Sequence, residues 1–515
     1  MFDSDVQSKT RQLRSGDETE CMNQLLFERA TGGLGANTFA KLETARLLRS
    51  FRPAPRFRFD GGEKGAAVNN GESNSSSANP NDDQKSNIWA HQAGVNALAL
   101  ERFDGRILLS GGSDATIKLW DVEQCGNPNN SHVYKPFAQI ARSDDKTKSH
   151  RFGITHLSFY PFDPAAFLSS SYDQTLKLWA TDSVQLSGSW DLESKLYTHA
   201  ISPIADHLLV ACGTAHPAVR LVDLRSGAAV QSLVAPGQLG AGGGAVLSLA
   251  WSPRHEHVLA SGTLDGAVRI WDVRRASGLI GLLDQEDSLG ILQRRGDVNG
   301  NHISDRGVRS SAKAHSGPVN GLTWTDDGAY IVSAGHDRRI RVWDTATGAN
   351  TLASFGPSIK NGQLANTPMF TTPVGLTPPR KELLFWPNET EILVMDLHEG
   401  NTVSRLRGVG ANISGVRAQR GGERTVKNRV TSIVWRGAGG AGGSSGIVPG
   451  ASNVSGGVYS GHTDGQIRAW VPQVRGLDEE DEDDTSEVAQ QEKVQKRKAL
   501  DDAFKSLMGQ KITFN

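Results

Sequence analysis

The chain has 515 residues, a net charge of −1 and a pI near 6.9. Such a balanced chain has no global positive field, which disfavours a stand-alone DNA-binding protein. Its three cysteines show no paired spacing and no nearby histidine cluster, so we expect neither a disulfide framework nor a zinc site. This cysteine pattern fits a reducing compartment. With no secretion signal and no apolar run long enough for a membrane span, we expect neither secretion nor a membrane-spanning segment.

The N-terminal region is predicted to hold a disordered stretch at 1–21 and a helix–loop–helix leader at 22–53. Met22–Ala30 carries apolar residues at helical spacing. The spacing resumes over Thr38–Ser50, with Thr38 as a candidate N-cap. This pattern fits two roles equally: packing on the protein's own surface, or docking to a partner.

One short pattern recurs along residues 54–472. In its sharpest copy, Asp265–Arg274, an Asp in a tight turn precedes an alternating apolar strand, and a Trp follows six residues after the Asp. The same interval joins four further pairs: Asp114 and Trp120, Asp173 and Trp179, Asp337 and Trp343, Asp464 and Trp470. Its recurrence indicates an internal repeat.

Polar residues recur with the same pattern. A Ser lies four residues before each Asp, and in three copies a His lies 28 or 29 residues before the Trp. Because buried polar groups need partners, we expect these residues to bond to one another within each copy. The predicted sets are His91, Ser110, Asp114 and Trp120; His150, Ser169, Asp173 and Trp179; and His315, Ser333, Asp337 and Trp343. The sets and their Trp-Asp ending resemble WD40 repeats.

Two degenerate copies, ending at Asp223 and Asp396, bring the number of units to seven. Tails and insertions are set aside before the period is counted: 1–53, 61–86, 286–312, 357–367, 409–428, 437–457 and 473–515. Each unit is then about 45 residues long, close to the WD40 period. We therefore predict an all-β fold, a seven-bladed WD40 β-propeller over 54–472 with a short N-terminal helix–loop–helix and flexible tails. The last unit lacks a fourth strand, for which Arg56–Phe59 is the candidate.

The region 473–515 is predicted to be an acidic tail with a candidate C-terminal helix, because seven consecutive acidic residues, 478–484, precede an irregular apolar pattern. No arrangement of residues predicts catalysis. His255-Glu-His257 lacks a third metal ligand, and the repeated Ser, His and Asp sets indicate scaffold because they recur. We expect no enzyme, no cofactor and no metal site.

The window Val258–Arg274 resembles the motif shared by WD40 receptors of cullin-4 ubiquitin ligases. In that group an Arg two residues after Trp-Asp faces the adaptor, damaged-DNA-binding protein 1. The resemblance implies this role for Arg274, with Asp265, Trp271 and Asp272 shaping the turn and strand that hold it. An Arg fork suits carboxylate or carbonyl partners. The alternative is that Arg274 is an ordinary surface Arg after a strand. Leu221–Arg225 is a second, imperfect copy of the motif.

Further windows, including Leu168–Trp179, Trp251–Arg254 and Ala314–Leu322, closely resemble the Cockayne syndrome A family, strongly over 88–356 and more loosely over 357–472. That family carries a helix–loop–helix that inserts into the adaptor. The resemblance assigns this contact to six leader residues: Leu25, Leu26, Phe27, Leu42, Leu47 and Leu48.

The resemblance implies a non-catalytic substrate receptor of a cullin-4 RING ligase that acts in transcription-coupled nucleotide excision repair in the nucleus. Implied partners are the adaptor, the ligase, a Cockayne syndrome B-type translocase and stalled RNA polymerase II. The alternative is a WD40 scaffold or chromatin-peptide reader without ligase association. Direct specific binding of nucleic acid is disfavoured by the absence of a basic stripe interleaved with aromatics, and no membrane contact is expected.

Overall fold

A computed structural model describes most of the chain. The described residues are 18–62, 88–124, 131–145, 147–226, 229–235, 244–275, 278–286, 291–292, 312–408, 413–417, 423–436 and 457–472. The predicted tail at 473–515 lies outside the described residues, as do most of the expected insertions at 61–86, 286–312 and 437–457.

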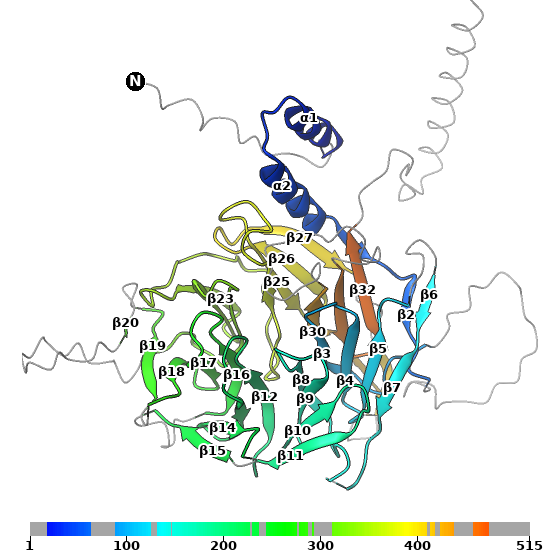
Figure 1. Cartoon of the computed structure of the whole chain (residues 1–515), viewed down its shortest axis with the longest axis vertical. Coiled ribbons are helices and arrows are strands. Elements are labelled where there is room, and N and C mark those ends of the chain that lie inside the picture. The colour runs from blue at the N-terminus through cyan, green and yellow to red at the C-terminus, as the bar shows by residue number, and fades with distance from the viewer. Residues whose placement is uncertain are drawn as a thin grey trace, which may run out of the picture. The chain divides into compact units, whose positions relative to one another are not determined.

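The described strands form nine sheets, and seven of these are the blades, which are arranged in a ring (Figure 1). Blade 1 contains β3 (Val95–Leu100), β4 (Ile107–Gly112), β5 (Ile117–Asp121) and β7 (Pro136–Ile140). Blade 2 contains β8 (Ile154–Phe159), β9 (Ala166–Ser171), β10 (Thr175–Ala180) and β11 (Leu186–Asp191). Blade 3 contains β12 (Leu196–Ile201), β13 (Leu209–Thr214), β14 (Val219–Asp223) and β15 (Ala229–Leu233).

The remaining blades vary more in strand number. Blade 4 adds β20 (Ile291–Leu292) to β16 (Val246–Trp251), β17 (Val258–Thr263), β18 (Val268–Asp272) and β19 (Leu279–Leu283). Blade 5 contains β21 (Val319–Trp324), β22 (Tyr330–Gly335) and β23 (Arg339–Asp344). Blade 6 contains β24 (Phe370–Thr371), β25 (Leu383–Asn388), β26 (Glu391–Asp396) and β27 (Thr402–Arg407), and blade 7 contains β1 (Phe51–Pro53), β30 (Val430–Trp435), β31 (Val458–His462) and β32 (Ile467–Pro472). A separate hairpin pairs β28 (Ile413–Arg417) with β29 (Glu423–Val426).

Antiparallel register gives the ring two distinct faces. In blade 1, Val95 pairs with Gly112 at one end of the sheet, whereas Ile107 pairs with Asp121 at the other end. We call the first end the Asp-turn face, because the turns holding the repeat Asp residues lie there. The second end is the Trp-Asp face, where each Trp-bearing strand finishes. Blade 4 repeats this register.

Burial of apolar side chains closes the ring. Seven larger buried clusters each join two neighbouring blades, beginning with blades 7 and 1 through Tyr459 and Trp120 and ending with blades 6 and 7 through Phe385 and Trp470. Each repeat alone would leave one sheet face in water, so neighbours stabilise each other by covering it.

The closing strand is not the one predicted. Phe51–Pro53 pairs antiparallel with β32, whereas Phe57–Phe59 (β2) pairs parallel with β6 (His132–Tyr134). The alternating pattern at 56–59 reflects real burial, because Phe57 and Phe59 are both buried. Their place is a small two-stranded sheet beside blade 1, where Phe59 stacks on Tyr134 with ring centroids 4.9 Å apart. The closing strand does come from the N-terminal side of the first repeat.

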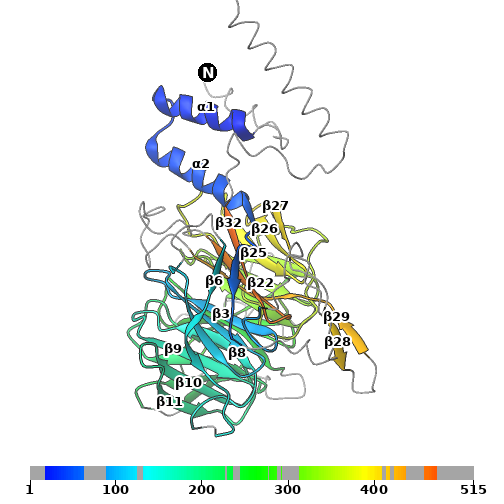
Figure 2. The same cartoon turned by 90° about the vertical axis from the view of Figure 1, so that its right-hand side faces the viewer.

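The leader forms two helices outside the ring (Figure 2). Helix α1 spans Glu18–Ala30, so it begins before residue 22, and α2 spans Ala36–Arg49. The N-cap of α2 is Gly35 and makes no side-chain cap bond, which corrects the assignment of Thr38 to that position. Neither described helix is long and apolar enough to cross a membrane.

Candidate functional site

The structure brings together the polar residues that the repeat pattern groups in blade 2. His150 Nε2 lies 2.7 Å from Ser169 Oγ, which accepts a hydrogen bond from Trp179 Nε1 at 2.8 Å. The other ring nitrogen, Nδ1, lies 2.9 Å from Asp173 Oδ2. Hydrogen bonds from this His and from Thr175 lower the pKa of Asp173, despite an opposing effect of burial.

Blades 1 and 5 repeat this chain of contacts. Ser110 bonds to His91 and Trp120, and Ser333 bonds to His315 and Trp343, all between 2.7 and 2.8 Å. Asp114 and Asp337 lie within 3.3 and 2.9 Å of the corresponding His Nδ1 atoms. The His, Ser and Trp residues of the three sets and Asp173 are buried, whereas Asp114 and Asp337 are half-buried. The chain of bonds joins each blade's turn to its middle strands, which is the arrangement of a structural network.

In blades 4 and 7 the turn Asp bonds to an Arg, a residue that the sequence pattern did not single out. Arg269 Nη2 donates to Asp265 Oδ2 at 2.7 Å, and Arg468 Nη2 donates to Asp464 Oδ2 at 2.6 Å. In blade 7 the His contact comes from His462, whose Nε2 lies 2.8 Å from Ser460 Oγ. The available signal was an Arg two residues before the Trp, where blades 1 and 2 have Lys; blade 5 carries the same Arg, Arg341, beside its His.

Arg274 lies on the Trp-Asp face of blade 4. Its backbone N–H donates to Asp272 Oδ1, and its guanidinium donates from Nε and Nη2 to the same carboxylate, each at 3.1 Å. Arg275 Nε lies 3.3 Å from Asp272 Oδ2. The bonds from Arg274 lower the pKa of Asp272. Nevertheless 63% of the Arg274 side chain stays exposed, so the carboxylate orients a guanidinium that is still accessible.

The other residues predicted beside Arg274 do not share its exposure. Trp271 is fully buried, with its Nε1 bonded to Ser261 at 2.8 Å. Asp265 precedes β18 and lies on the Asp-turn face, at the opposite end of the blade. Neither can touch a partner held by Arg274, so the part expected of both residues, to shape the strand and turn that precede Arg274, involves no contact of their own with a partner.

The leader divides into exposed and buried apolar residues. In α1, Leu26 and Phe27 are 47% and 68% exposed, and Leu25 is half-buried. In α2, Leu42 and Leu47 are half-buried, but Leu48 is only 4% exposed and packs in the cluster that holds Phe51 and Trp470. The assignment of Leu48 to partner contact is therefore wrong, because its side chain belongs to the core between blades 6 and 7.

Strand register places the leader and Arg274 on one face. Phe51, which follows α2, pairs with Pro472 at the finishing end of β32. Arg274 follows Asp272 at the finishing end of β18, and both are third strands of their repeats. Two exposed apolar residues, Phe162 and Ile204, lie in turns on this same face in blades 2 and 3.

His255-Glu-His257 lies near this face and meets a third histidine. His207 stacks on His257 with ring centroids 5.5 Å apart, and its Nε2 bonds to the Glu256 backbone oxygen at 3.0 Å. Both His207 ring nitrogens are engaged, since Nδ1 accepts from the Leu209 N–H at 3.4 Å. Within the described ranges no group of three His, Cys, Asp or Glu residues is arranged to hold a metal ion.

Comparison with known proteins identifies the repeats. The family model described as WD domain, G-beta repeat matches residues 83–121, 143–180, 236–272 and 308–344. The chain is 29% identical over 439 residues to WD repeat-containing protein ATCSA-1 of Arabidopsis thaliana, covering 75% of this chain and 88% of that protein. It is 26% identical over 276 residues to ribosome biogenesis protein ytm1 of Aspergillus niger, covering 50% and 53%. The chain thus spans about half the length of that second relative.

These findings correct the predicted resemblance to the Cockayne syndrome A family. A relative at 29% identity is distant, and proteins named for ribosome biogenesis match as well. The similarity shown is to WD40 repeat proteins at large, which are typically scaffolds for protein–protein interaction. The four matched repeats, the seven blades and the recurring Ser–Trp bonds lead to one conclusion: the chain is a seven-bladed WD40 β-propeller.

Proposed function

We propose that this propeller is a non-catalytic substrate receptor of a cullin-4 RING ubiquitin ligase, docking on damaged-DNA-binding protein 1 with its Trp-Asp face. The carrying observation is Arg274, an exposed guanidinium held in a fixed direction by Asp272. An oriented Arg fork loses little conformational freedom when it binds, so it suits a contact residue.

The leader supports the same surface. Phe27 and Leu26 expose apolar area that a helix of this length would ordinarily bury against a neighbour. Because α2 joins blade 7 at the Trp-Asp face, a single partner that lies across this face can meet both elements. Phe162 and Ile204 extend the apolar area between blades.

The test measures binding of purified adaptor to the full chain. Arg274→Glu should weaken binding by about tenfold or more, because a carboxylate would replace the cation that the bound adaptor covers. Arg339→Glu is the control and should leave the affinity unchanged: Arg339 is exposed and lies at the Asp-turn end of blade 5, away from the proposed contact. A triple variant, Arg274→Glu with Leu26→Asp and Phe27→Asp, is compared with wild type. Equal affinity of the two for the adaptor would refute adaptor docking.

The cellular process and the further partners of this receptor are also part of the proposal. We place the receptor in the nucleus, in transcription-coupled nucleotide excision repair, with a Cockayne syndrome B-type translocase and stalled RNA polymerase II as partners. Its support is the motif ending in Arg274. After a transcription-blocking lesion, the wild-type chain should co-purify with RNA polymerase II more than in untreated cells. Unchanged recovery would remove the repair role and leave adaptor docking standing.

The second candidate function is a scaffold or chromatin-peptide reader that never meets a ligase. A plain scaffold agrees with the fold and with relatives named for other processes. A reader of methylated lysine needs aromatic rings around a cation. At the ring's centre Tyr172 and Tyr197 lie edge to face with centroids 6.2 Å apart, but Arg429 lines the same hollow, and its positive charge opposes a cationic ligand.

A further inference from the structure

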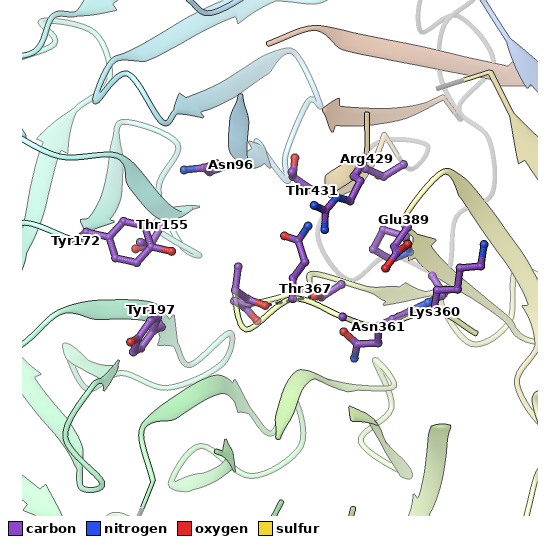
Figure 3. A pocket seen from close by; sticks show the side chains of 17 residues that line it. Asn96, Thr155, Tyr172, Tyr197, Lys360, Asn361, Thr367, Glu389, Arg429 and Thr431 are labelled. Atoms are coloured by element: carbon purple, nitrogen blue, oxygen red, sulfur yellow. Dashed lines mark hydrogen bonds between the residues drawn. The ribbon is translucent and has the colours of Figure 1, made fainter. Parts of the chain in front are cut away.

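A hollow opens at the centre of the Asp-turn face (Figure 3). Its lining residues come from five blades, and the empty space between them, including open solvent at the mouth, is about 690 Å³. Asn96 of blade 1, Thr155 and Tyr172 of blade 2 and Tyr197 of blade 3 form one side. The other side is formed by Trp386 and Glu389 of blade 6 and by Arg429 and Thr431 of blade 7.

The floor is the segment 360–367, which the sequence pattern had set aside with the insertions. Asn320 Nδ2 donates to Asn361 Oδ1 at 2.9 Å and to the Gln363 backbone oxygen at 2.8 Å. Asn366 Nδ2 reaches across to Thr198 Oγ1 in blade 3 at 3.2 Å. Because a fully buried Asn320 and a contact to another blade hold this segment, the hollow is formed before any ligand arrives.

Arg429 is the unusual group in this hollow. Its side chain is half-buried and points into the space between Thr431 and Thr367 (Figure 3). With its amide oxygen turned inward, Gln363 accepts from Arg429 Nη1 and, at 3.3 Å, from Arg429 Nε, so the partner of this guanidinium is a neutral group. Arg269, Arg341 and Arg468 each have an Asp partner within 2.8 Å. Across the described residues Arg429 makes no such ion pair, although Glu389 lines the same hollow.

A half-buried guanidinium beside a neutral amide favours an anionic ligand with a planar, bidentate group. On the opposite side, the rings of Tyr172 and Tyr197 stand edge to face and offer apolar ring surface beside two hydroxyl groups. We propose that this hollow binds an extended acidic segment of a protein partner. One side-chain carboxylate pairs with Arg429, and the neighbouring residue lies against Tyr172 and Tyr197.

This site is independent of the proposed ligase role. Asn96, beside the Val95–Gly112 end of blade 1, lies at the opposite end of the ring from Asp272 and Arg274. One partner at each face can therefore be held at the same time, and failure at one face leaves the other untouched.

The test uses fluorescence polarisation with the full chain and a labelled peptide, Gly-Ser-Tyr-Glu-Glu-Ser-Gly. The matched peptide carries Gln in place of both Glu residues. We expect the Glu peptide to bind about tenfold or more tightly than the Gln peptide, since only the carboxylate pairs with the guanidinium. Arg429→Met should remove that difference, and Arg429→Lys should restore part of it.

Lys427→Met is the control, because Lys427 is exposed, lies two residues away and does not line the hollow. It should leave the affinity for the Glu peptide unchanged, and the thermal midpoint of each variant reports whether it folds. Equal binding of the two peptides overturns the proposal, as does an unchanged affinity in Arg429→Met. Absence of Glu-peptide binding at millimolar concentration also overturns it.

Discussion

The carboxylate of Asp272 accepts two hydrogen bonds from the guanidinium of Arg274, from Nε to Oδ1 and from Nη2 to Oδ2, each 3.1 Å long. The carboxylate itself is nearly buried, whereas the Arg side chain is mostly exposed. The last residue of a core strand therefore sets the direction of a surface group two residues beyond it.

This relationship predicts the effect of Asp272→Asn. The amide keeps the size of the side chain but loses the charge that orients Arg274, so the guanidinium becomes free to rotate. We expect adaptor affinity to fall by about threefold to fivefold, less than for Arg274→Glu, because a mostly exposed pair contributes about 1 kcal/mol or less. Calorimetric titration with purified adaptor measures it. A loss as large as that of Arg274→Glu would indicate that Asp272 acts by another route.

The repeat network predicts a graded loss of stability. Ser169→Ala removes the partner of both His150 and Trp179, whereas Ser261→Ala removes only the partner of Trp271. Each buried group left without a bond costs about 1–3 kcal/mol. Ser169→Ala should therefore lower the urea midpoint roughly twice as far as Ser261→Ala. Equal shifts would show that the His contact contributes nothing.

Ring closure depends on Phe51. This residue is 1% exposed, contacts Phe385 of blade 6 edge to face at 6.0 Å and pairs with Pro472 of blade 7. Phe51→Ala should cost about 3–5 kcal/mol, as for other buried aromatic residues. Arg52→Ala, at the exposed neighbouring position of the same strand, should change thermal stability little. Similar melting temperatures for the two variants would contradict closure by this strand.

Stability should also fall with acidification. His199 is buried between Ser158 and Ser170, with its ring nitrogens 2.8 and 3.0 Å from the two hydroxyl groups. Burial lowers its pKa well below 6.5, and the nearby His156 and His150 lower it further. The unfolded chain takes up a proton near pH 6.5 but the folded chain does not, so this stabilisation is complete above pH 6.5 and is lost below it.

The measurement is the melting temperature between pH 7.5 and 5. We expect it to fall as pH drops below 6.5, and to fall less steeply in His199→Gln, which has no titrating group at this position. Histidines 150, 315 and 462 also have lowered pKa values owing to burial, so part of the slope should persist. Parallel slopes in wild type and His199→Gln would exclude His199 as a source.

The sequence by itself determined the repeat. An Asp, an alternating strand and a Trp six residues on are local features, so their periodicity predicted the blades and the Ser169–Trp179 type of bond. Even blades with Val222 or Met395 in place of Trp could be found, because both side chains are fully buried apolar residues that preserve the alternation.

Only the tertiary structure decided which segments meet across long distances in the chain. Phe51–Pro53 and Phe57–Phe59 are both short and half apolar, and the choice of closing strand depended on the partners that each could cover, β32 or β6. Likewise, a segment such as 360–367 carries no periodic signal, yet Asn320 and Thr198 fix it across the ring. Packing between residues so far apart in the chain follows from ring geometry, which no local pattern encodes.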